Sequence, residues 1–143
     1  MQINVYSIEK KEDFAKEINE FIKKSKQFAN IKNITLYPKN LAKSSNPKKE
    51  YSKIFEKYLD NGVNIILSPD GKLIDSFEFA KFFEHSNVNF FIAGAYGFED
   101  EFKKKGTLIS LSPLTMSHKI AKLVLFEQIY RGLSIKNNHP YHK

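Results

Sequence analysis

The sequence predicts a single α/β domain, residues 1–143, built on a mostly parallel sheet with helices on both faces. Strand-like and helix-like segments alternate along the whole chain, which is the order that parallel strands with crossover helices require. Two nearly continuous apolar runs, residues 63–67 and 88–93, are bounded by turn residues, as is typical of strands buried on both faces. The length of 143 residues suits one domain, and no repeat or linker interrupts it.

The first half of the chain predicts two strands and two helices. A short strand at residues 3–7 precedes a helix at residues 14–22, where apolar residues recur at i, i+4, i+7 and i+8. A strand at residues 34–36 precedes a second helix, residues 51–59, with the same kind of apolar stripe. We expect Gly62 to end that helix, because glycine is favoured just after a helix C-terminus.

The second half predicts three strands and two more helices. Residues 68–71, Ser-Pro-Asp-Gly, form a turn signal that should close the strand before them. A short Phe-rich helix begins near Asp75 or Ser76, and a last strand covers residues 107–111. The final helix, residues 117–132, is apolar nearly all round, which predicts burial in the core or in a subunit interface.

Composition excludes several classes of protein. The chain has no Cys, so it holds no disulfide, no Cys-based zinc site and no Cys nucleophile. The most apolar stretch, residues 90–98, is far shorter than the roughly 20 residues of a membrane-spanning helix. The N-terminus reads as a strand rather than a signal peptide. We therefore expect a cytoplasmic protein without membrane contact.

Positive charge gathers in two regions of this chain of net charge +7. Residues 37–49 hold four Lys and no acid, and we expect them to form a mobile basic loop; residues 103–143 hold eight Lys or Arg and one acid. Such clusters are commonly solvated surface. Their concentration in two places also fits a surface that faces RNA.

Two segments could bind a ligand. Ala93 and Gly94 follow an apolar strand, where small residues allow a ligand to approach the backbone, although a simple tight turn explains them equally well. The chain has neither a dinucleotide-binding fingerprint nor a P-loop. Residues 109–118 are irregular around Pro113, so their backbone groups are free to bond a ligand; they also read as a plain connection with Ser117 as helix N-cap.

The last helix and the tail hold the other candidate groups. Glu127 and Arg131 stand at i and i+4, so they form either an internal ion pair or a site where Arg131 contacts an anion. The tail contains His139 and His142, but Pro140 between them prevents a helical ligand face. No metal site is expected.

These segments together resemble one family over the whole chain. Its most specific residues are the runs 110–118 (Ser-Leu-Ser-Pro-Leu-Thr-Met-Ser-His), 127–131 (Glu-Gln-Ile-Tyr-Arg) and 138–143 (Asn-His-Pro-Tyr-His-Lys). The chain resembles the SPOUT-class methyltransferases that methylate N3 of a pseudouridine in large-subunit (23S) ribosomal RNA. The resemblance implies a C-terminal trefoil knot, a homodimer, and S-adenosylmethionine held in the knot loops. Carried over by position, the cofactor would contact Leu67, Ala93, Gly94, Leu111, Ser112, Pro113, Leu114, Thr115 and Met116.

The resemblance also implies roles for the tail. Arg131, Tyr141 and His142 would be catalytic, and Arg131, His139 and Lys143 would hold the RNA. His142 is the candidate for assisting loss of the imide proton, because an unperturbed His titrates near neutral pH. Two alternatives remain: a non-catalytic basic RNA-binding protein, and a nucleotide-binding or phospho-acceptor domain.

The chain departs from the family pattern at three places. Ala93 stands where the family usually has Gly, and Ser68 replaces a usual acid. Residues 117–119, Ser-His-Lys, stand where Pro-His-Pro is common. None of these changes removes a required side chain, because the implied loop contacts are mainly made by the backbone.

Overall fold

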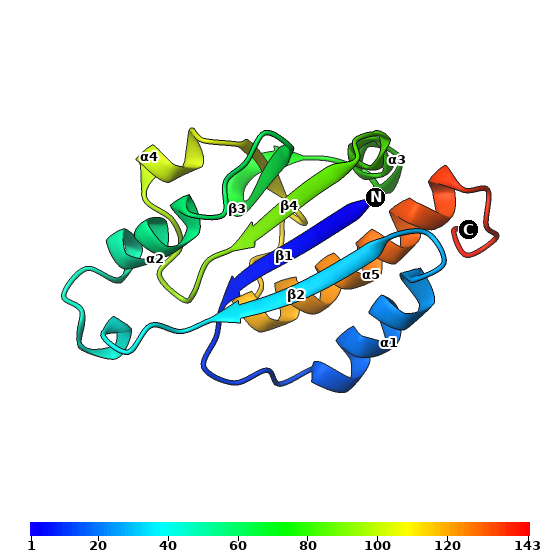
Figure 1. Ribbon diagram of the computed structural model, residues 1–143. Coiled ribbons are helices and arrows are strands. Elements are labelled where there is room, and N and C mark those ends of the chain that lie inside the picture. Colours follow the sequence, from blue (N-terminus) through cyan, green and yellow to red (C-terminus); the bar gives the residue numbers. More distant parts are fainter.

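A five-stranded, all-parallel sheet runs through the computed structural model, which describes residues 1–143 (Figure 1). The strand order is β2-β1-β4-β3-β5. Because every strand is parallel to its neighbours, all five carboxyl ends meet at one edge, where ligands of open α/β sheets bind. The strands are β1 (Gln2–Ile8), β2 (Asn30–Leu36), β3 (Val63–Leu73), β4 (Asn87–Ile92) and β5 (Thr107–Ser110).

Helices cover both faces of the sheet, as the sequence predicts. Helices α1, α3 and α5 pack on one face, while α2 and α4 pack on the other (Figure 1). None of the helices combines the length and the apolar character that a membrane span needs. The helices are α1 (Ala15–Ser25), α2 (Pro47–Glu56), α3 (Ser76–Ala80), α4 (Asp100–Lys103) and α5 (His118–Lys136), with 3-10 turns η1 (Leu41–Lys43) and η2 (Lys81–Glu84).

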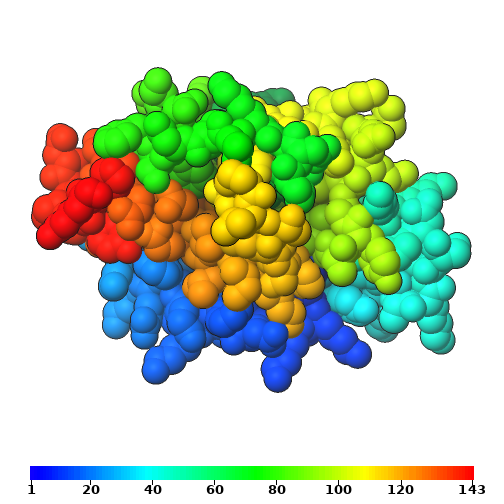
Figure 2. Space-filling model, turned by 180° about the vertical axis from the view of Figure 1, so that it is seen from behind, coloured from blue at the N-terminus to red at the C-terminus, as the bar shows by residue number.

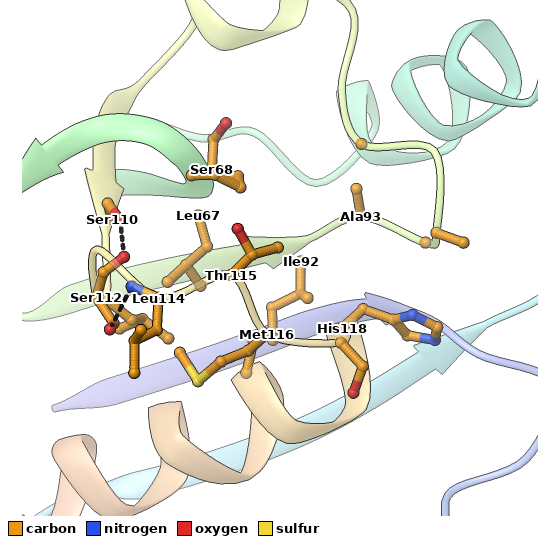
Figure 3. A pocket seen from close by; sticks show the side chains of 17 residues that line it. Leu67, Ser68, Ile92, Ala93, Ser110, Ser112, Leu114, Thr115, Met116 and His118 are labelled. Carbon is orange, nitrogen blue, oxygen red and sulfur yellow. Dashed lines mark hydrogen bonds between the residues drawn. The ribbon is translucent and has the colours of Figure 1, made fainter.

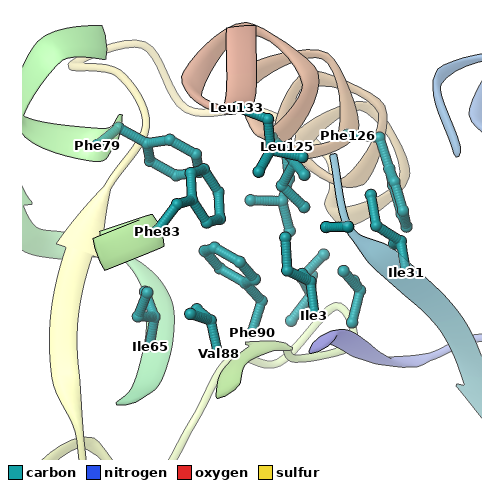
Figure 4. Packing of buried hydrophobic residues seen from close by; sticks show 14 of the residues in the cluster. Ile3, Ile31, Ile65, Phe79, Phe83, Val88, Phe90, Leu125, Phe126 and Leu133 are labelled. Atoms are coloured by element: carbon teal, nitrogen blue, oxygen red, sulfur yellow. The ribbon is translucent and has the colours of Figure 1, made fainter. Parts of the chain in front are cut away.

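Strand β4 separates the two halves of the core. Val88 and Phe90 belong to the cluster under α3 and α5, whereas Phe91, which follows Phe90 on the opposite side of the strand, belongs to the cluster under α2 and α4. On the first face, Phe79 stacks on Phe90 at a centroid distance of 5.7 Å and meets Phe83 edge-on (Figure 4). Burial on both faces explains why this strand is largely apolar.

Helix α4 has no counterpart among the predicted elements. Its Phe102 is buried and stacks on Phe98 at 5.1 Å between centroids. Phe55 of α2 packs against the same pair. A helix of four residues is too short to give a periodic apolar signal, although the i, i+4 spacing of the two Phe residues hints at it.

Strand β3 does not end where its turn signal suggested. Leu67 and Lys72 both pair with Ile109 of β5, so residues 68–71 form a bulge inside the strand, which continues to Leu73. The prediction of a strand-ending turn at 68–71 is therefore wrong. The turn residues interrupt the register of β3, and the neighbouring outer strand β5 pairs with the residues on both sides of them.

The expected role of Gly62 is also wrong. Helix α2 ends at Glu56, with Lys57 still in a right-handed helical conformation, six residues before Gly62. The Gly62 N–H instead donates to Asp60 Oδ1 at 2.7 Å in the loop that leads to β3. At the other end of the chain, α5 extends beyond its predicted end to Lys136.

Candidate functional site

A pocket of about 520 Å³ opens at the carboxyl ends of β3, β4 and β5 (Figure 3). Residues from three segments line it: residues 67–69, where the first half of β3 ends; most of residues 92–97, at the end of β4; and most of residues 110–118, between β5 and α5. The first turn of α5 adds Ala121. The pocket thus lies where the topology of an open parallel sheet places ligand sites.

The structure brings together eight of the nine residues expected to contact the cofactor. Only Pro113 does not line the pocket, and its contact with a cofactor stays a prediction. Sequence reasoning missed several lining residues that lie within three residues of the predicted ones in the same segments, and this closeness in sequence is the signal that could have found them. The predicted lining residues are Leu67, Ala93, Gly94, Leu111, Ser112, Leu114, Thr115 and Met116; those missed include Ser68, Pro69, Ile92, Ala95, Gly97, Ser110 and His118.

The loop between β5 and α5 is held by its own side chains. Ser110 Oγ donates to the Ser112 carbonyl at 3.0 Å, and Ser112 Oγ accepts from the Leu114 N–H at 2.9 Å (Figure 3). The N–H groups of Thr115 and Met116 bond no other backbone group. Ser117 then caps α5 by accepting from the Ile120 N–H at 3.3 Å, as its N-cap reading predicts. The loop is ordered, yet it keeps backbone donors for a ligand.

Tyr51 of α2 supports the opposite wall. Tyr51 is 4% exposed, and a methyl group added at Gly94 would lie 2.7 Å from its Cζ. Glycine is therefore favoured at this position, because any Cβ would force the buried Tyr51 ring to shift. Burial raises the pKa of the Tyr51 hydroxyl, which stays a neutral packing group. Ala93 is buried in the same cluster, so its methyl group fits beside the pocket without displacing the turn.

The polar groups of the last helix and tail form a second cluster. Arg131 Nη2 lies 2.6 Å from Glu127 Oε1, which confirms the internal ion pair. Arg131 Nη1 lies 3.0 Å from His142 Nδ1, and the Tyr141 hydroxyl donates to Glu127 Oε1 at 3.2 Å. The Arg131 guanidinium also lies 4.8 Å from the centre of the Tyr141 ring. Four predicted groups of the helix and tail are thus brought together.

Contacts with Glu127 help to raise the pKa values of both Arg131 and Tyr141 in this cluster. Hydrogen bonding to Glu127 raises the pKa of Arg131. Burial, and then the Glu127 charge, raise the pKa of Tyr141, so that its hydroxyl keeps its proton at neutral pH. A guanidinium has only donors, so His142 Nδ1 must accept from Arg131 and the His142 proton sits on Nε2. We call the set Glu127, Arg131, Tyr141 and His142 the tail cluster.

The tail is anchored by packing. The His139 ring lies edge-on to Phe28 and to Tyr130, at centroid distances of 5.8 and 6.1 Å, and its backbone N–H donates to the Ser134 carbonyl. The chain reverses at Asn138, whose φ is +55°. His139 therefore fixes the path of the tail, and its contact with RNA stays a prediction. Lys143 is exposed beyond the cluster.

The pocket and the tail cluster lie at opposite ends of α5. Ala121 lines the pocket and Arg131 follows ten residues later, which corresponds to roughly 15 Å along a helix axis. Figure 2 shows the tail (red) at one end of the molecule and the segment around residues 111–117 (gold) near the middle of the same face, with residues of α5 (orange) between them. Within one chain, the structure does not bring the predicted catalytic residues beside the predicted cofactor residues.

Comparison with known proteins settles the family. A family model described as a predicted SPOUT methyltransferase matches residues 1–142. The chain belongs to the SPOUT methyltransferase family. Curated relatives span it almost completely: proteins of a Sulfurovum species and a Nitratiruptor species are 48% and 50% identical, over 100% and 99% of both chains. Both are named ribosomal RNA large subunit methyltransferase H.

Solved structures of methyltransferases share the fold at low sequence identity. The tRNA (m1G37) methyltransferase from Aquifex aeolicus gives a TM-score of 0.60 at 12% identity, covering 92% of this chain and 70% of that one. A probable methylase family protein from Haemophilus influenzae gives 0.59 at 17% identity, covering 99% and 70%. The predicted α/β class is confirmed, and the trefoil knot stays a prediction. No group of three or more His, Asp or Glu side chains lies together as a metal site would require.

Proposed function

We propose that this SPOUT methyltransferase transfers a methyl group from S-adenosylmethionine to N3 of a pseudouridine in large-subunit ribosomal RNA. The observation that carries the proposal is the pocket at the ends of β3, β4 and β5, formed by the residues that carry the family resemblance. Full-length relatives near 50% identity bear the name of a ribosomal RNA large subunit methyltransferase, which supports the RNA substrate. With a ribosomal substrate, we expect the protein to work in the cytoplasm.

The residues of the pocket fit the cofactor. Leu67, Ile92 and Met116 offer apolar walls for a flat base, and the free N–H groups of Thr115 and Met116 offer donors for its ring nitrogens. When bound, S-adenosylmethionine supplies an electrophilic methyl group on a sulfonium. The contribution of the chain is to hold that group and to exclude water from it.

We propose that a second copy of the chain completes the site. The tail cluster lies too far along α5 to reach the pocket of its own chain, whereas a two-fold pair can bring the tail of one copy to the pocket of the other. Large apolar side chains are exposed on α3, on α5 and in the loop before it: Phe77 at 58%, Leu114 at 77% and Ile120 at 40%. A homodimer that covers these side chains would explain their exposure.

The tail cluster then acts as a set of donors. Loss of the N3 proton places negative charge on the two flanking carbonyl oxygens of the base, and Arg131 and His142 Nε2–H can stabilise that charge. In this arrangement His142 Nδ1 already accepts from Arg131 and Nε2 holds its proton, so we assign His142 to donating a hydrogen bond rather than to removing the proton. Solvent is then the proton acceptor.

Subunit complementation tests both the activity and the shared site. Gly94→Ala should weaken cofactor binding and Arg131→Ala should remove the guanidinium of the tail cluster, so each variant alone should be nearly inactive when the cofactor concentration is kept low. Co-expression of the two in one cell gives mixed dimers with one intact site, and the purified mixture should recover about a quarter of wild-type activity. A mixture that stays inactive would show that each tail serves its own chain.

Two further measurements separate the alternatives. Titration of S-adenosylmethionine into the wild-type protein should release heat at micromolar protein, and the absence of heat would favour a non-catalytic RNA-binding protein over the enzyme. Mass mapping of ribosomal RNA from cells that lack the gene should show one methyl group missing from a pseudouridine. An unchanged methylation map would overturn the proposed substrate.

A further inference from the structure

The chain contains a single arginine among its 23 basic residues, and that residue is Arg131. Lysine provides the remaining positive charge. A guanidinium differs from an ammonium because its donors lie in one plane in a fixed arrangement. This arrangement can match the acceptor atoms of a ligand only when the guanidinium is held in the right orientation. The contacts that fix the orientation of Arg131 therefore bear on the reaction. They form a series of hydrogen bonds that begins on another helix, α3.

That chain of hydrogen bonds starts at α3. Ser76 Oγ donates to Gln128 Oε1 at 2.7 Å, joining α3 to α5 across 52 positions of sequence. Gln128 Nε2 donates to Glu127 Oε2 at 2.9 Å. The other oxygen of Glu127 accepts from Arg131 Nε at 2.9 Å and from Nη2 at 2.6 Å. Arg131 Nη1 then reaches His142 Nδ1 at 3.0 Å.

Each link fixes the direction of the next one. The carboxylate of Glu127 only accepts, so the Gln128 NH2 group must face it, and the Ser76 hydroxyl then holds the amide in place by donating to its oxygen. The carboxylate of Glu127 accepts on both oxygens and cannot rotate without losing a bond. Helix α3 also contacts the last residue of this hydrogen-bond series, because the Phe77 ring lies edge-on to His142 at a centroid distance of 4.9 Å.

We infer that Ser76 and Gln128 are positioning residues for methyl transfer, which act through Glu127 to fix the orientation of the only guanidinium in the protein. This inference rests on the proposed function, because it gives Arg131 a part in the reaction. Neither residue belongs to the tail cluster, and the family resemblance assigns neither of them a role.

Because Arg131 is the only arginine of the chain, the environment of its guanidinium can be followed directly by NMR spectroscopy. The Nε–Hε group of Arg131 gives one signal in a nitrogen–proton correlation spectrum, without any assignment. In the wild-type protein this proton should exchange slowly, because it is bonded to Glu127. Ser76→Ala and Gln128→Ala should each shift the signal and speed its exchange, whereas Ser76→Thr keeps the hydroxyl and should restore both.

Activity should follow the signal. At saturating cofactor and RNA, Ser76→Ala and Gln128→Ala should each lower kcat about three- to tenfold, while the dissociation constant for S-adenosylmethionine stays unchanged. In the Gln128→Ala background, Ser76→Ala should have no further effect, because both residues act through one path.

Asp75→Ala is the matched control. Asp75 caps α3 by accepting from the Glu78 N–H at 2.8 Å, so its loss loosens the same helix end without removing a link of the chain. It should leave the Arg131 signal and kcat unchanged. Equal losses from Asp75→Ala, or a moved signal with an unchanged kcat, would overturn the inference. A wild-type protein that transfers no methyl group would overturn the proposed function, whereas the signal of Arg131 would still test the hydrogen-bond chain itself.

Discussion

Lys122 Nζ lies 2.7 Å from Glu9 Oε2, and both side chains are almost completely buried, at 1% and 2% exposed. Glu9 Oε2 also accepts from Ser7 Oγ at 3.0 Å. Glu12 Oε1 makes a second ion-pair contact with Nζ at 2.7 Å, without the alignment of a hydrogen bond. The first turns of α5 are thereby tied to the end of β1, next to the residues that line the pocket.

The first prediction concerns this buried group of charges. Lys122→Met leaves Glu9 and Glu12 without a cation, and the free energy of unfolding should fall by about 3–5 kcal/mol in denaturant titrations. Lys119→Met is the control, since Lys119 pairs with Asp13 at 2.7 Å on the surface and its loss should cost at most about 1 kcal/mol. Equal losses from the two variants would contradict the prediction.

The second prediction concerns the wall of the pocket. Gly94→Ala drives a methyl group into the Tyr51 ring and should weaken binding of S-adenosylhomocysteine by about tenfold or more in calorimetry. Gly97→Ala is a useful contrast, because its Cβ would meet nothing within 4 Å and only the positive φ of 75° is strained. That variant should lose about 1 kcal/mol of stability and keep most of its affinity. The reverse order of affinities would show that Tyr51 does not limit the turn.

The third prediction concerns acid stability. Burial raises the pKa of Asp60, but hydrogen bonds from neighbours that include the Gly62 N–H and the Asn87 amide, each at 2.7 Å, outweigh it and hold the pKa below its ordinary 3.8. A lowered carboxyl pKa stabilises the fold above the unfolded value, and this stability is lost as pH falls through the folded value. The wild type should be more stable than Asp60→Asn at pH 7, and the gap should close below pH 3.8. A gap that stays constant with pH would refute this assignment.

The fourth prediction concerns the basic segment 37–49. Lys43→Ala combined with Lys48→Ala should lower the slope of log affinity for ribosomal RNA against log salt by about 1.5 units, if both side chains contact phosphates. Lys16→Ala combined with Lys23→Ala, on α1, removes the same charge elsewhere and should change the slope little. Similar slopes for the two pairs would show that segment 37–49 is ordinary solvated surface.

Residues whose neighbours in sequence decide their structure were predicted well. The apolar runs of β3 and β4 identify buried strands because a strand covered on both faces is apolar on both sides. Ser117 identifies the start of α5 because a cap is a local hydrogen bond. Segment 37–49, expected to be a mobile loop, instead contains the turn η1 with Leu41 buried at 6% exposed, a contact that local composition does not reveal.

Features that depend on contacts between distant segments were not predictable. The Ser-Pro-Asp-Gly signal at 68–71 is a bulge because Ile109 of β5 pairs on both sides of it, and nothing in the signal itself shows the partner strand. Spacing along α5 placed Glu127 and Arg131 correctly as a pair. The spacing could not show that α5 separates Arg131 from the pocket, because positions along one helix do not reveal which strand ends and loops pack near each of its turns.

The strand order has a consequence for how copies of this chain can associate. Strands β2 and β5 are the two outer strands, so each carries backbone groups that could pair with another sheet. β5 is only four residues long, and β2 carries the exposed Lys32 near its centre. Short outer strands and lysine side chains both block strand addition, which protects the protein against aggregation through its sheet. The proposed homodimer would therefore form through helices and loops, with the two sheets kept separate.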